Sequence, residues 1–223
     1  MEIITIPCGP VMANSYILRR EGSPTCAVID PADAGLIYDR LQREGLVCTH
    51  ILLTHGHFDH VWGVADLKER TGARVYLHEA DADMAAGRPA YFSAMSYGLK
   101  PCAADVFVRE GDIIEAGGLT FRVLETPGHT KGGVCYAVDG EKTVFTGDTL
   151  FCESVGRTDL GGDIRELMDS LFHKLYALDG YTVYPGHEES TTIEHEKQFN
   201  PMNTYRDHPW FSGSPTPGAF STT

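Results

Sequence analysis

The sequence predicts a mixed α/β (α+β) domain built in layers, with helices covering the faces of its sheets. Short apolar runs rich in β-branched residues recur along the chain, and they outnumber the segments with helical periodicity. Several of these runs are joined by tight turns, such as the turn at 138–141. Short strands interleaved with helices are typical of layered α/β domains rather than of helical bundles.

The strand predictions rest on short runs of Val, Ile, Thr, Tyr and Phe bounded by Gly, Pro, Asp or Asn. In chain order, the expected strands are Ile3–Ile6, Ser15–Leu18, Cys26–Ile29, His50–Leu53, Arg74–Leu77, Val106–Val108, Leu119–Leu124, Val134–Val138, Thr143–Phe145 and Thr182–Tyr184.

Three helices are expected. The clearest covers Asp163–Leu178, where apolar residues recur at i, i+3 and i+4 and would form one buried face. Asp163 stands at the position of an N-cap, and a glycine follows the end of the segment. The segments Ala34–Glu44 and Val61–Thr71 have the same character, and each is followed directly by a glycine.

The chain length of 223 residues is enough for one domain with a sizeable core, which we expect to cover 1–210. Residues 211–223 are rich in Ser, Thr, Pro and Gly, and they are expected to form a disordered tail. The segment 87–105 has no clear period and is longer than most loops, so it is either a lid or an insertion. Its aromatic residues Tyr91, Phe92 and Tyr97 would wall a pocket or anchor the segment on the core.

Charge and cysteine usage exclude several classes of protein. The formal net charge of −13 argues against a nucleic acid or an anionic membrane surface as the main partner. The sequence has no long apolar stretch that would span a membrane and no export signal, and its six cysteines are widely dispersed. These features favour a cytoplasmic enzyme with reduced thiols that acts on a small molecule, and nothing in them indicates an oligomeric state.

The strongest chemical signal is the segment Thr54–His60, which follows an apolar run and contains three histidines and one aspartate. In an extended segment, side chains at i and i+2 point the same way, so His55 and His57 can bind one ion. A turn into a helix at Val61 would aim Asp59 and His60 at a second position nearby. Imidazole and carboxylate ligands suit zinc, iron or manganese. The pattern therefore predicts a metal site.

Three further loops follow apolar runs in the same way, and each carries one metal-ligating side chain next to a glycine. These side chains are His129, Asp148 and His187. A glycine allows the backbone to turn sharply toward a shared centre. A single Pro-Gly-His segment is a weak signal, but the four loops together are specific.

Taken in order from His55 to His187, the four loops resemble those of the metallo-β-lactamase-fold hydrolases. This resemblance implies a four-layer αββα sandwich of two similar halves, with the site at one edge of the two sheets. It also implies two divalent metal ions, most simply zinc, with iron and manganese as alternatives. The implied ligands are His55, His57 and His129 for the first metal, Asp59, His60 and His187 for the second, and Asp148 as the bridge between them. In such sites a metal-bridging hydroxide is the nucleophile, and Asp59 would both ligate and orient it.

Within this superfamily, the segments 146–151, 155–159 and 191–201 resemble the short single-domain glyoxalase II-like enzymes, the hydroxyacylglutathione hydrolases. That resemblance implies a thioesterase that cleaves S-acyl glutathione, such as S-lactoylglutathione. The long enzymes of this kind bind glutathione carboxylates through basic residues of a C-terminal helical domain. Only 36 residues follow His187 here, so we expect part of that anion-binding apparatus to be missing.

Two basic residues remain as candidates for binding a substrate carboxylate. Arg157 is the better candidate, because its guanidinium offers a bidentate fork, and Lys131, which lies close to His129, is the second. A structural ion pair of Arg157 with Asp159 or Asp163 is an equally good interpretation.

Two other activities stay open. Persulfide dioxygenases of the same fold share the segment 157–159 and bind one ferrous ion through two histidines and an aspartate, here His55, His129 and Asp148. The presence of the second set of ligands favours hydrolysis, and another small-ester or lactone hydrolase is the remaining alternative. The other histidines are expected to be surface or core residues: His50, His78, His173, His195 and His208.

Overall fold

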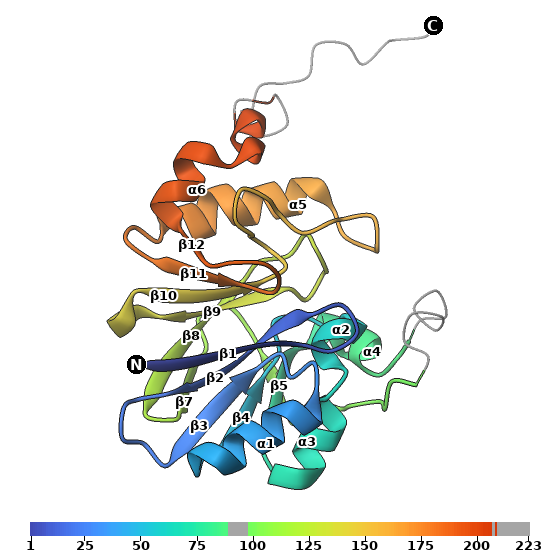
Figure 1. Ribbon diagram of the computed structural model, residues 1–223. Helices are drawn as coiled ribbons and strands as arrows, with labels where there is room; N and C mark the ends of the chain where they lie inside the picture. The colour runs from blue at the N-terminus through green and yellow to red at the C-terminus, as the bar shows by residue number, and fades with distance from the viewer. Residues whose placement is uncertain (89–97, 207, 209–223) are drawn as a thin grey trace, which may run out of the picture.

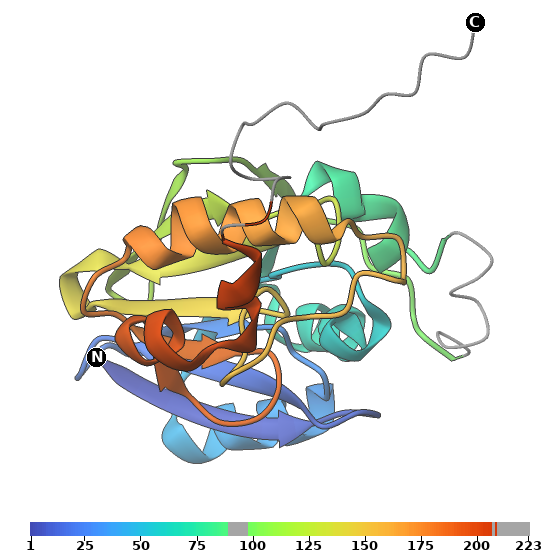
Figure 2. The same ribbon diagram turned by 90° about the horizontal axis from the view of Figure 1, so that it is seen from above.

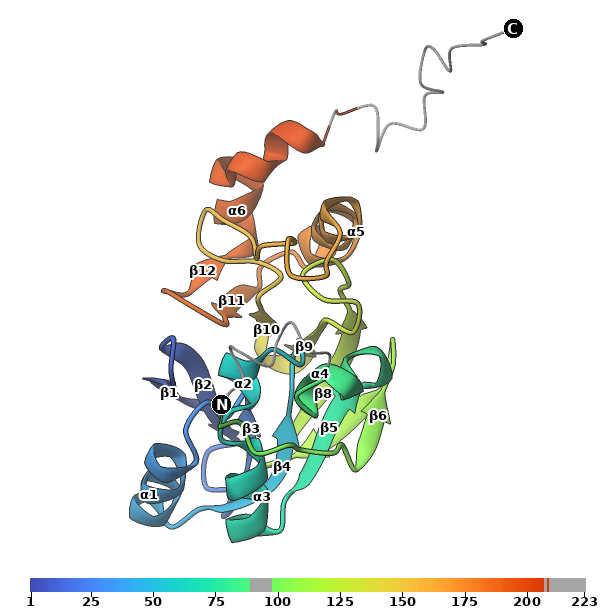
Figure 3. The same ribbon diagram turned by 90° about the vertical axis from the view of Figure 1, so that its right-hand side faces the viewer.

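Two six-stranded sheets lie face to face, and helices cover the outer face of each sheet (Figure 1). The computed structural model describes residues 1–88, 98–206 and 208. This arrangement is the four-layer αββα sandwich that the resemblance implies, and it confirms the expected mixed α/β class. Figure 3 shows the layers from the side, with α1 and α3 at the bottom and α5 and α6 at the top.

The first sheet contains the N-terminal strands in sequence order. The pairs β1–β2 and β2–β3 are antiparallel, and the pairs from β3–β4 to β5–β6 are parallel. The strands are β1 (Glu2–Cys8), β2 (Ala13–Arg19), β3 (Thr25–Ile29), β4 (Val47–Leu52), β5 (Arg74–His78) and β6 (Val106–Val108).

The second sheet has the order β12-β11-β10-β9-β8-β7 and is antiparallel except between β10 and β11. Its strands are β7 (Ile113–Ala116), β8 (Leu119–Glu125), β9 (Val134–Val138), β10 (Thr143–Gly147), β11 (Thr182–Pro185) and β12 (Thr191–Thr192). In this sheet β8, β10 and β11 all run in one direction, so the loops that follow them leave the sheet at the same edge.

Each pair of outer helices buries an apolar face against its own sheet. The helices α1 (Ala34–Glu44) and α3 (Val64–Thr71) pack on the first sheet, while α5 (Ile164–Asp169) and α6 (Ile193–Phe199) pack on the second. Figure 2 shows the last two from above, lying over the second sheet. The short helices α2 (Phe58–Val61) and α4 (Ala82–Ala85) lie at the end of the sandwich where the ligand loops gather.

The core between the sheets is aromatic, and two of its tyrosines also hydrogen-bond across the sandwich. Tyr16, Phe121, Tyr136 and Phe145 are all buried there. The Tyr136 hydroxyl of β9 donates to the carbonyl of Leu53 at 2.9 Å, and the Tyr16 hydroxyl of β2 donates to the carbonyl of Pro185 at 2.5 Å. Because both carbonyls lie at the start of ligand loops, the core itself aligns the two halves of the site.

All ten expected strands are present, and the sequence prediction missed the two edge strands of the second sheet, β7 and β12. The helix at Ala34–Glu44 is confirmed, with Asp33 capping it through the amide of Leu36. The helix that begins after Asp163 is also confirmed, but it continues from α5 as a π-helical stretch, Ser170–Lys174, and then as a 3₁₀ turn.

The prediction of a single helix at Val61–Thr71 is wrong, because the helix is interrupted between α2 and α3. Gly63 marks the break: its amide donates to the carbonyl of Pro31 at 2.8 Å. A Cβ at this position would lie 2.5 Å from the backbone nitrogen of Ala34, so the backbones are in direct contact. The interruption lets α2, which carries Asp59 and His60, take a different direction from α3.

Some expectations fall outside the described residues. Tyr91, Phe92 and Tyr97 lie in 89–97, and the expected tail at 211–223 is likewise not described. Among the described residues, no helix is both long and apolar enough to cross a membrane.

Candidate metal centre

Four loops from the two halves of the molecule meet at one end of the sandwich. They follow β4 in the first sheet and β8, β10 and β11 in the second, as the strand predictions required. Seven side chains come together there, and they are the seven named from the sequence: His55, His57, Asp59, His60, His129, Asp148 and His187.

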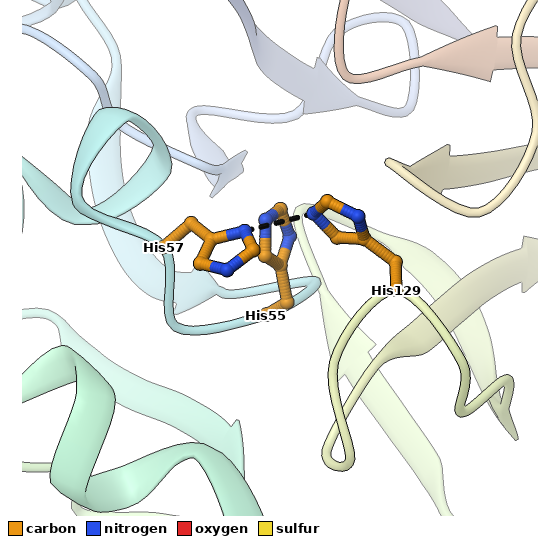
Figure 4. Close-up of side chains that lie close together, drawn as sticks. All are labelled: His55, His57 and His129. Carbon is orange, nitrogen blue, oxygen red and sulfur yellow. Dashed lines mark hydrogen bonds between the residues drawn. The ribbon is translucent and has the colours of Figure 1, made fainter. Parts of the chain in front are cut away.

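Three buried imidazoles form the first ligand group, which consists of His55, His57 and His129. One nitrogen from each ring lies within 4.8 Å of the others. Figure 4 shows the rings turned toward one another, two from the loop after β4 and one from the loop after β8, with Nδ1 of His57 2.8 Å from Nε2 of His129. Three imidazole nitrogens converging in this way can hold one metal ion.

The second ligand group consists of Asp59, His60 and His187, whose ligand atoms also lie within 4.8 Å of one another. Asp59 and His60 lie on α2, and His187 follows β11. The carboxylate Oδ2 of Asp59 is 3.3 Å from Nε2 of His187 and 3.7 Å from Nε2 of His60. Unlike the first group, this one mixes an anionic ligand with imidazoles.

Asp148 lies between the two groups. Its Oδ2 is 3.5 Å from Nε2 of His129 in the first group and 3.7 Å from Nε2 of His187 in the second. Its Oδ1 is 3.2 Å from Nε2 of His60. One carboxylate is therefore within reach of both positions at which a metal could bind.

Hydrogen bonds fix which nitrogen of three imidazoles carries the proton. The Nδ1 atoms of His60 and His129 donate to Asp30 Oδ2 at 3.0 Å and to the carbonyl of Arg157 at 2.6 Å. The Thr54 hydroxyl gives its only proton to Asp30 Oδ2, so it accepts from Nδ1 of His55. In the neutral form of each of these three rings, the Nε2 lone pair faces the centre, as metal ligation requires.

The centre contains buried polar atoms without hydrogen bonds. Within the described part of the chain, Nε2 of His55, Nε2 of His60 and Oδ1 of Asp148 make none. Burying such atoms is unfavourable unless something else satisfies them. Lone pairs that converge from nitrogens and a carboxylate oxygen fit divalent cations. The residues present therefore fit the two metal ions that the sequence predicts.

Burial and local charge act differently on the two groups. In the first group, burial keeps the pKa of His55 well below its usual value, lowers that of His57 to about 3 and also lowers that of His129. In the second group, burial lowers the pKa of His60, but the carboxylates of Asp148 and Asp30 outweigh burial and raise it well above its usual value.

The carboxylates stay ionised in this environment. Burial raises the pKa of Asp148, but the neighbouring imidazoles, His60 above all, lower it by more. The pKa of Asp59 is lowered in the same way, chiefly by its hydrogen bond with His187. Neutral imidazoles in the first group and ionised carboxylates beside both groups are the protonation states that a divalent metal needs.

Two buried aspartates that the sequence analysis did not single out hold the ligand loops. Asp30, directly after β3, accepts from the Thr54 amide at 2.8 Å and from His60. Asp81 accepts from the amide of Gly56 at 2.9 Å and from the hydroxyl of Thr130 at 2.7 Å, so it connects the loops after β4 and β8. Asp30 had a sequence signal, an acid at the end of an apolar run, whereas Asp81 had none.

Glycine is required at Gly186 because the backbone there touches the ligands. A Cβ at Gly186 would lie 2.2 Å from Oδ1 of Asp148 and 2.7 Å from Cε1 of His60. Gly186 thus brings the loop after β11 into contact with Asp148 and His60, as well as allowing a turn.

A cavity of about 650 Å³ opens above the centre. Five of the seven ligands line its floor, all except the fully buried His55 and His60. Its walls are largely apolar and come from three segments of the chain: Val11, Met12, Phe58, Phe151, Val155 and Leu160. Arg157 and Glu188 are the charged residues of the wall. The size is that of a pocket for a small molecule.

Arg157 pairs with Asp159, which was one of the two interpretations of this residue. Its Nε and one terminal nitrogen each donate to a carboxylate oxygen of Asp159 at 2.6 Å. Asp163 instead caps α5. Lys131 is exposed and is not among the residues that line the cavity.

The other histidines that are described lie away from the centre. His50 stacks on Tyr76, and His78 bonds Glu125. His195 bonds Glu153 and lies near Cys152 and Glu196. The Glu196 carboxylate there already accepts hydrogen bonds from Thr191 and Asn200, which tie the C-terminal segment down.

The model of the metallo-beta-lactamase superfamily matches residues 8–187, a span that includes all seven side chains. The chain belongs to the metallo-beta-lactamase superfamily. Members in two organisms illustrate the range. The probable metallo-hydrolase YqgX of Bacillus subtilis is 35% identical over 88% of this chain and 95% of its own length. A hydroxyacylglutathione hydrolase of Nitrobacter hamburgensis is 42% identical over 77% of this chain, but only 61% of its own length is covered.

Solved structures share both fold and sequence with this chain. The BLEG-1 B3 metallo-beta-lactamase is 36% identical with a TM-score of 0.83, covering 91% of this chain and 100% of its own. TTHA1623, solved in a di-iron-bound form, is 36% identical with a TM-score of 0.78, over 89% and 99% of the two chains. ETHE1 from Myxococcus xanthus is 32% identical with a TM-score of 0.76, over 95% and 88%. The chain is thus a metallo-hydrolase of this superfamily.

Proposed function

We propose that the protein is a binuclear metal-dependent thioesterase of the glyoxalase II-like kind, which hydrolyses S-acyl thiols such as S-lactoylglutathione. The observation that carries the proposal is that two complete ligand groups share one carboxylate, that of Asp148, at the floor of an open cavity. In this proposal His55, His57 and His129 hold one ion, Asp59, His60 and His187 hold the other, and Asp148 bridges them.

Two divalent ions in such a site, zinc or alternatively iron or manganese, supply an acidified water and a Lewis acid for the thioester carbonyl. The chain's own residues do the rest. The carboxylate of Asp59, at the floor of the cavity, orients the attacking water and accepts its proton. Asp30 and the Arg157 carbonyl keep the imidazoles of His60 and His129 in the ligating tautomer. The apolar walls exclude bulk water from the thioester.

The relatives support this proposal at different levels. A hydroxyacylglutathione hydrolase matches 77% of this chain, but this chain covers only 61% of it. The whole relative's activity therefore comes here only as a proposal. The di-iron-bound form of a neighbour 36% identical to this chain supports two metals rather than one.

The test combines metal analysis with a release assay on one preparation. We expect about two metals per chain by elemental analysis and thiol release from S-lactoylglutathione. Two metals without release from any S-acyl thiol would remove the thioesterase and leave another ester or lactone hydrolase, for which lactone and β-lactam substrates are the next assays.

A second outcome would point to oxidation. The subset His55, His129 and Asp148 is also a possible site for a single ferrous ion in a persulfide dioxygenase. One iron per chain, with oxygen uptake on glutathione persulfide and no thiol release, would replace the hydrolase proposal. The complete second ligand group favours the hydrolase.

A further inference from the structure

The residues in the wall of the cavity, rather than the candidate ligands on its floor, indicate what kind of substrate it would bind. This inference rests on the proposed thioesterase function and concerns the part of the substrate beyond the scissile bond. The relevant features are the turn between β1 and β2, the charged groups of the wall, and the way each of them is held.

The turn between β1 and β2 presents two adjacent apolar side chains to the cavity. Val11 is 51% exposed and Met12 is 61% exposed, and both line the cavity. Single exposed apolar residues are ordinary, but two in succession at the mouth of a pocket mark a contact surface. Phe58, Phe151 and Leu160 line the same cavity from other loops. A bound substrate would remove these side chains from water, which favours apolar groups.

The hairpin is anchored to the loop that carries His187, so its tip has a defined place. The backbone amide of Asn14 donates to the carbonyl of Gly186 at 2.7 Å. The side-chain amide of Asn14 donates to the carbonyls of Pro185 at 3.1 Å and Glu188 at 2.9 Å. The two apolar side chains are therefore held over the second ligand group by three hydrogen bonds.

The basic residue in the cavity wall is already paired with an acid, so it is a poor partner for a substrate carboxylate. Among the described residues that line the cavity, Arg157 is the single Lys or Arg. Both arms of its fork are bound to Asp159, so the pair is close to neutral as a whole. Glu188 adds a negative charge to the wall. A dicarboxylate such as glutathione would find little to bind and some repulsion.

We propose that the cavity selects thioesters whose portion beyond the scissile bond is apolar and carries no carboxylate. Such substrates are S-acyl thiols with a neutral thiol part or a hydrophobic acyl chain. Val11 and Met12 contact that portion, and the Arg157–Asp159 pair together with Glu188 disfavours anionic competitors.

The first experiment compares S-lactoylglutathione with its diethyl ester on the metal-loaded enzyme. The two substrates have the same thioester and nearly the same size, and they differ in the two carboxylates. We expect kcat/KM to be about fivefold higher for the diester, the upper range for exposed charge interactions. A preference for S-lactoylglutathione itself would overturn the inference while leaving the thioesterase intact. Hydrolysis of neither substrate would overturn the proposed function and this inference with it.

The second experiment changes the wall. Asp159→Asn releases Arg157, so the ratio of kcat/KM for S-lactoylglutathione over its diester should rise about threefold. Asp179→Asn also removes an exposed acid from an ion pair, with Lys197, but outside the cavity, and should leave that ratio unchanged. An unchanged ratio in Asp159→Asn would refute the charge part of the proposal.

The apolar part is tested with acetyl and hexanoyl thioesters of N-acetylcysteamine, a neutral thiol. Met12→Gln should reduce the preference for the hexanoyl chain about threefold, near the contribution of one buried methylene group. Ile113→Gln is the matched control, because Ile113 is 56% exposed on β7 and does not line the cavity. Equal hexanoyl preference in the wild type and in Met12→Gln would overturn the assigned contact.

Discussion

The two ligand groups are alike in size but differ in how the protein holds them. In the first group, the imidazoles of His55 and His129 donate to neutral acceptors, the Thr54 hydroxyl and the Arg157 carbonyl. In the second group, His60 donates to the carboxylate of Asp30. All three imidazoles of the first group are buried, whereas His187 of the second is partly exposed to the cavity.

Because of this difference, two ions bound at the two groups would differ in how strongly protons compete with them. Burial lowers the pKa of the first group's imidazoles, and the neutral hydrogen-bond acceptors do not offset it, so these imidazoles stay neutral before a metal binds. A carboxylate acceptor such as Asp30 makes an imidazole more basic. Burial lowers the pKa of His60, but Asp148 and Asp30 together outweigh burial and raise it. A more basic nitrogen binds a metal more strongly, but it also binds protons more strongly. The second metal should therefore be the one that responds to conditions.

The largest effect is expected where the two groups meet. Asp148→Asn should lower the content of both metals and reduce thiol release by more than the roughly 10–100-fold typical of losing an outer hydrogen-bond partner. The reason is that the Asp148 carboxylate lies within reach of both groups. Elemental analysis and steady-state kinetics check this, with Asp179→Asn as the control. Two bound metals with full turnover in Asp148→Asn would remove the bridging role.

A smaller loss is expected from the support of the second group. Asp30→Asn should weaken metal binding about 10–100-fold, with the second-group metal lost first, because His60 loses its charged partner. The asparagine oxygen can still accept from the Thr54 amide, so the fold should be retained, which a thermal melt would check. Equal loss of both metals on titration with a chelator would show that Asp30 supports the groups alike.

Acidification should separate the groups without any mutation. Because the pKa of His60 is raised, a proton competes for its Nε2 at a pH where the first group's imidazoles are still neutral. As the pH falls from about 7 to about 4, the second-group metal should leave before the first. Metal content after dialysis at each pH measures this, and His187→Ala, which lacks a second-group ligand, should lack the earlier step. A single step in the wild type would contradict the comparison.

The smallest effect is expected at Arg157. Its carbonyl orients His129, but the carbonyl belongs to the backbone and survives Arg157→Ala. The side chain forms an exposed ion pair with Asp159, which water screens, so stability should change little. Metal content should stay at the wild-type value, as measured beside Asp30→Asn. Loss of the first-group metal in Arg157→Ala would mean that the side chain, not the backbone, holds His129.

Much of the fold and of the candidate site could be predicted from local patterns. Alternating and β-branched runs marked ten of the twelve strands, because strand formation depends on side chains close in sequence. The two missed strands are short. β12 has two residues, and in β7 an exposed isoleucine precedes a buried one, so its sequence does not follow its alternating burial. The break at Gly63 was missed because its cause is the contact with Pro31 and Ala34, which no local pattern reveals.

The sequence by itself determined the chemistry of the candidate centre: seven side chains of types that can bind a metal, each directly after a strand or in the turn that follows one. The tertiary structure decided their grouping and protonation. The supporting roles of Asp30 and Asp81 could be recognised only from contacts between segments that are far apart in the sequence. The partner of Arg157 was one of two acids considered from the sequence, Asp159 and Asp163. The physical reason is that ligand type is a property of a residue, whereas basicity, orientation and charge balance depend on neighbours that only folding brings close.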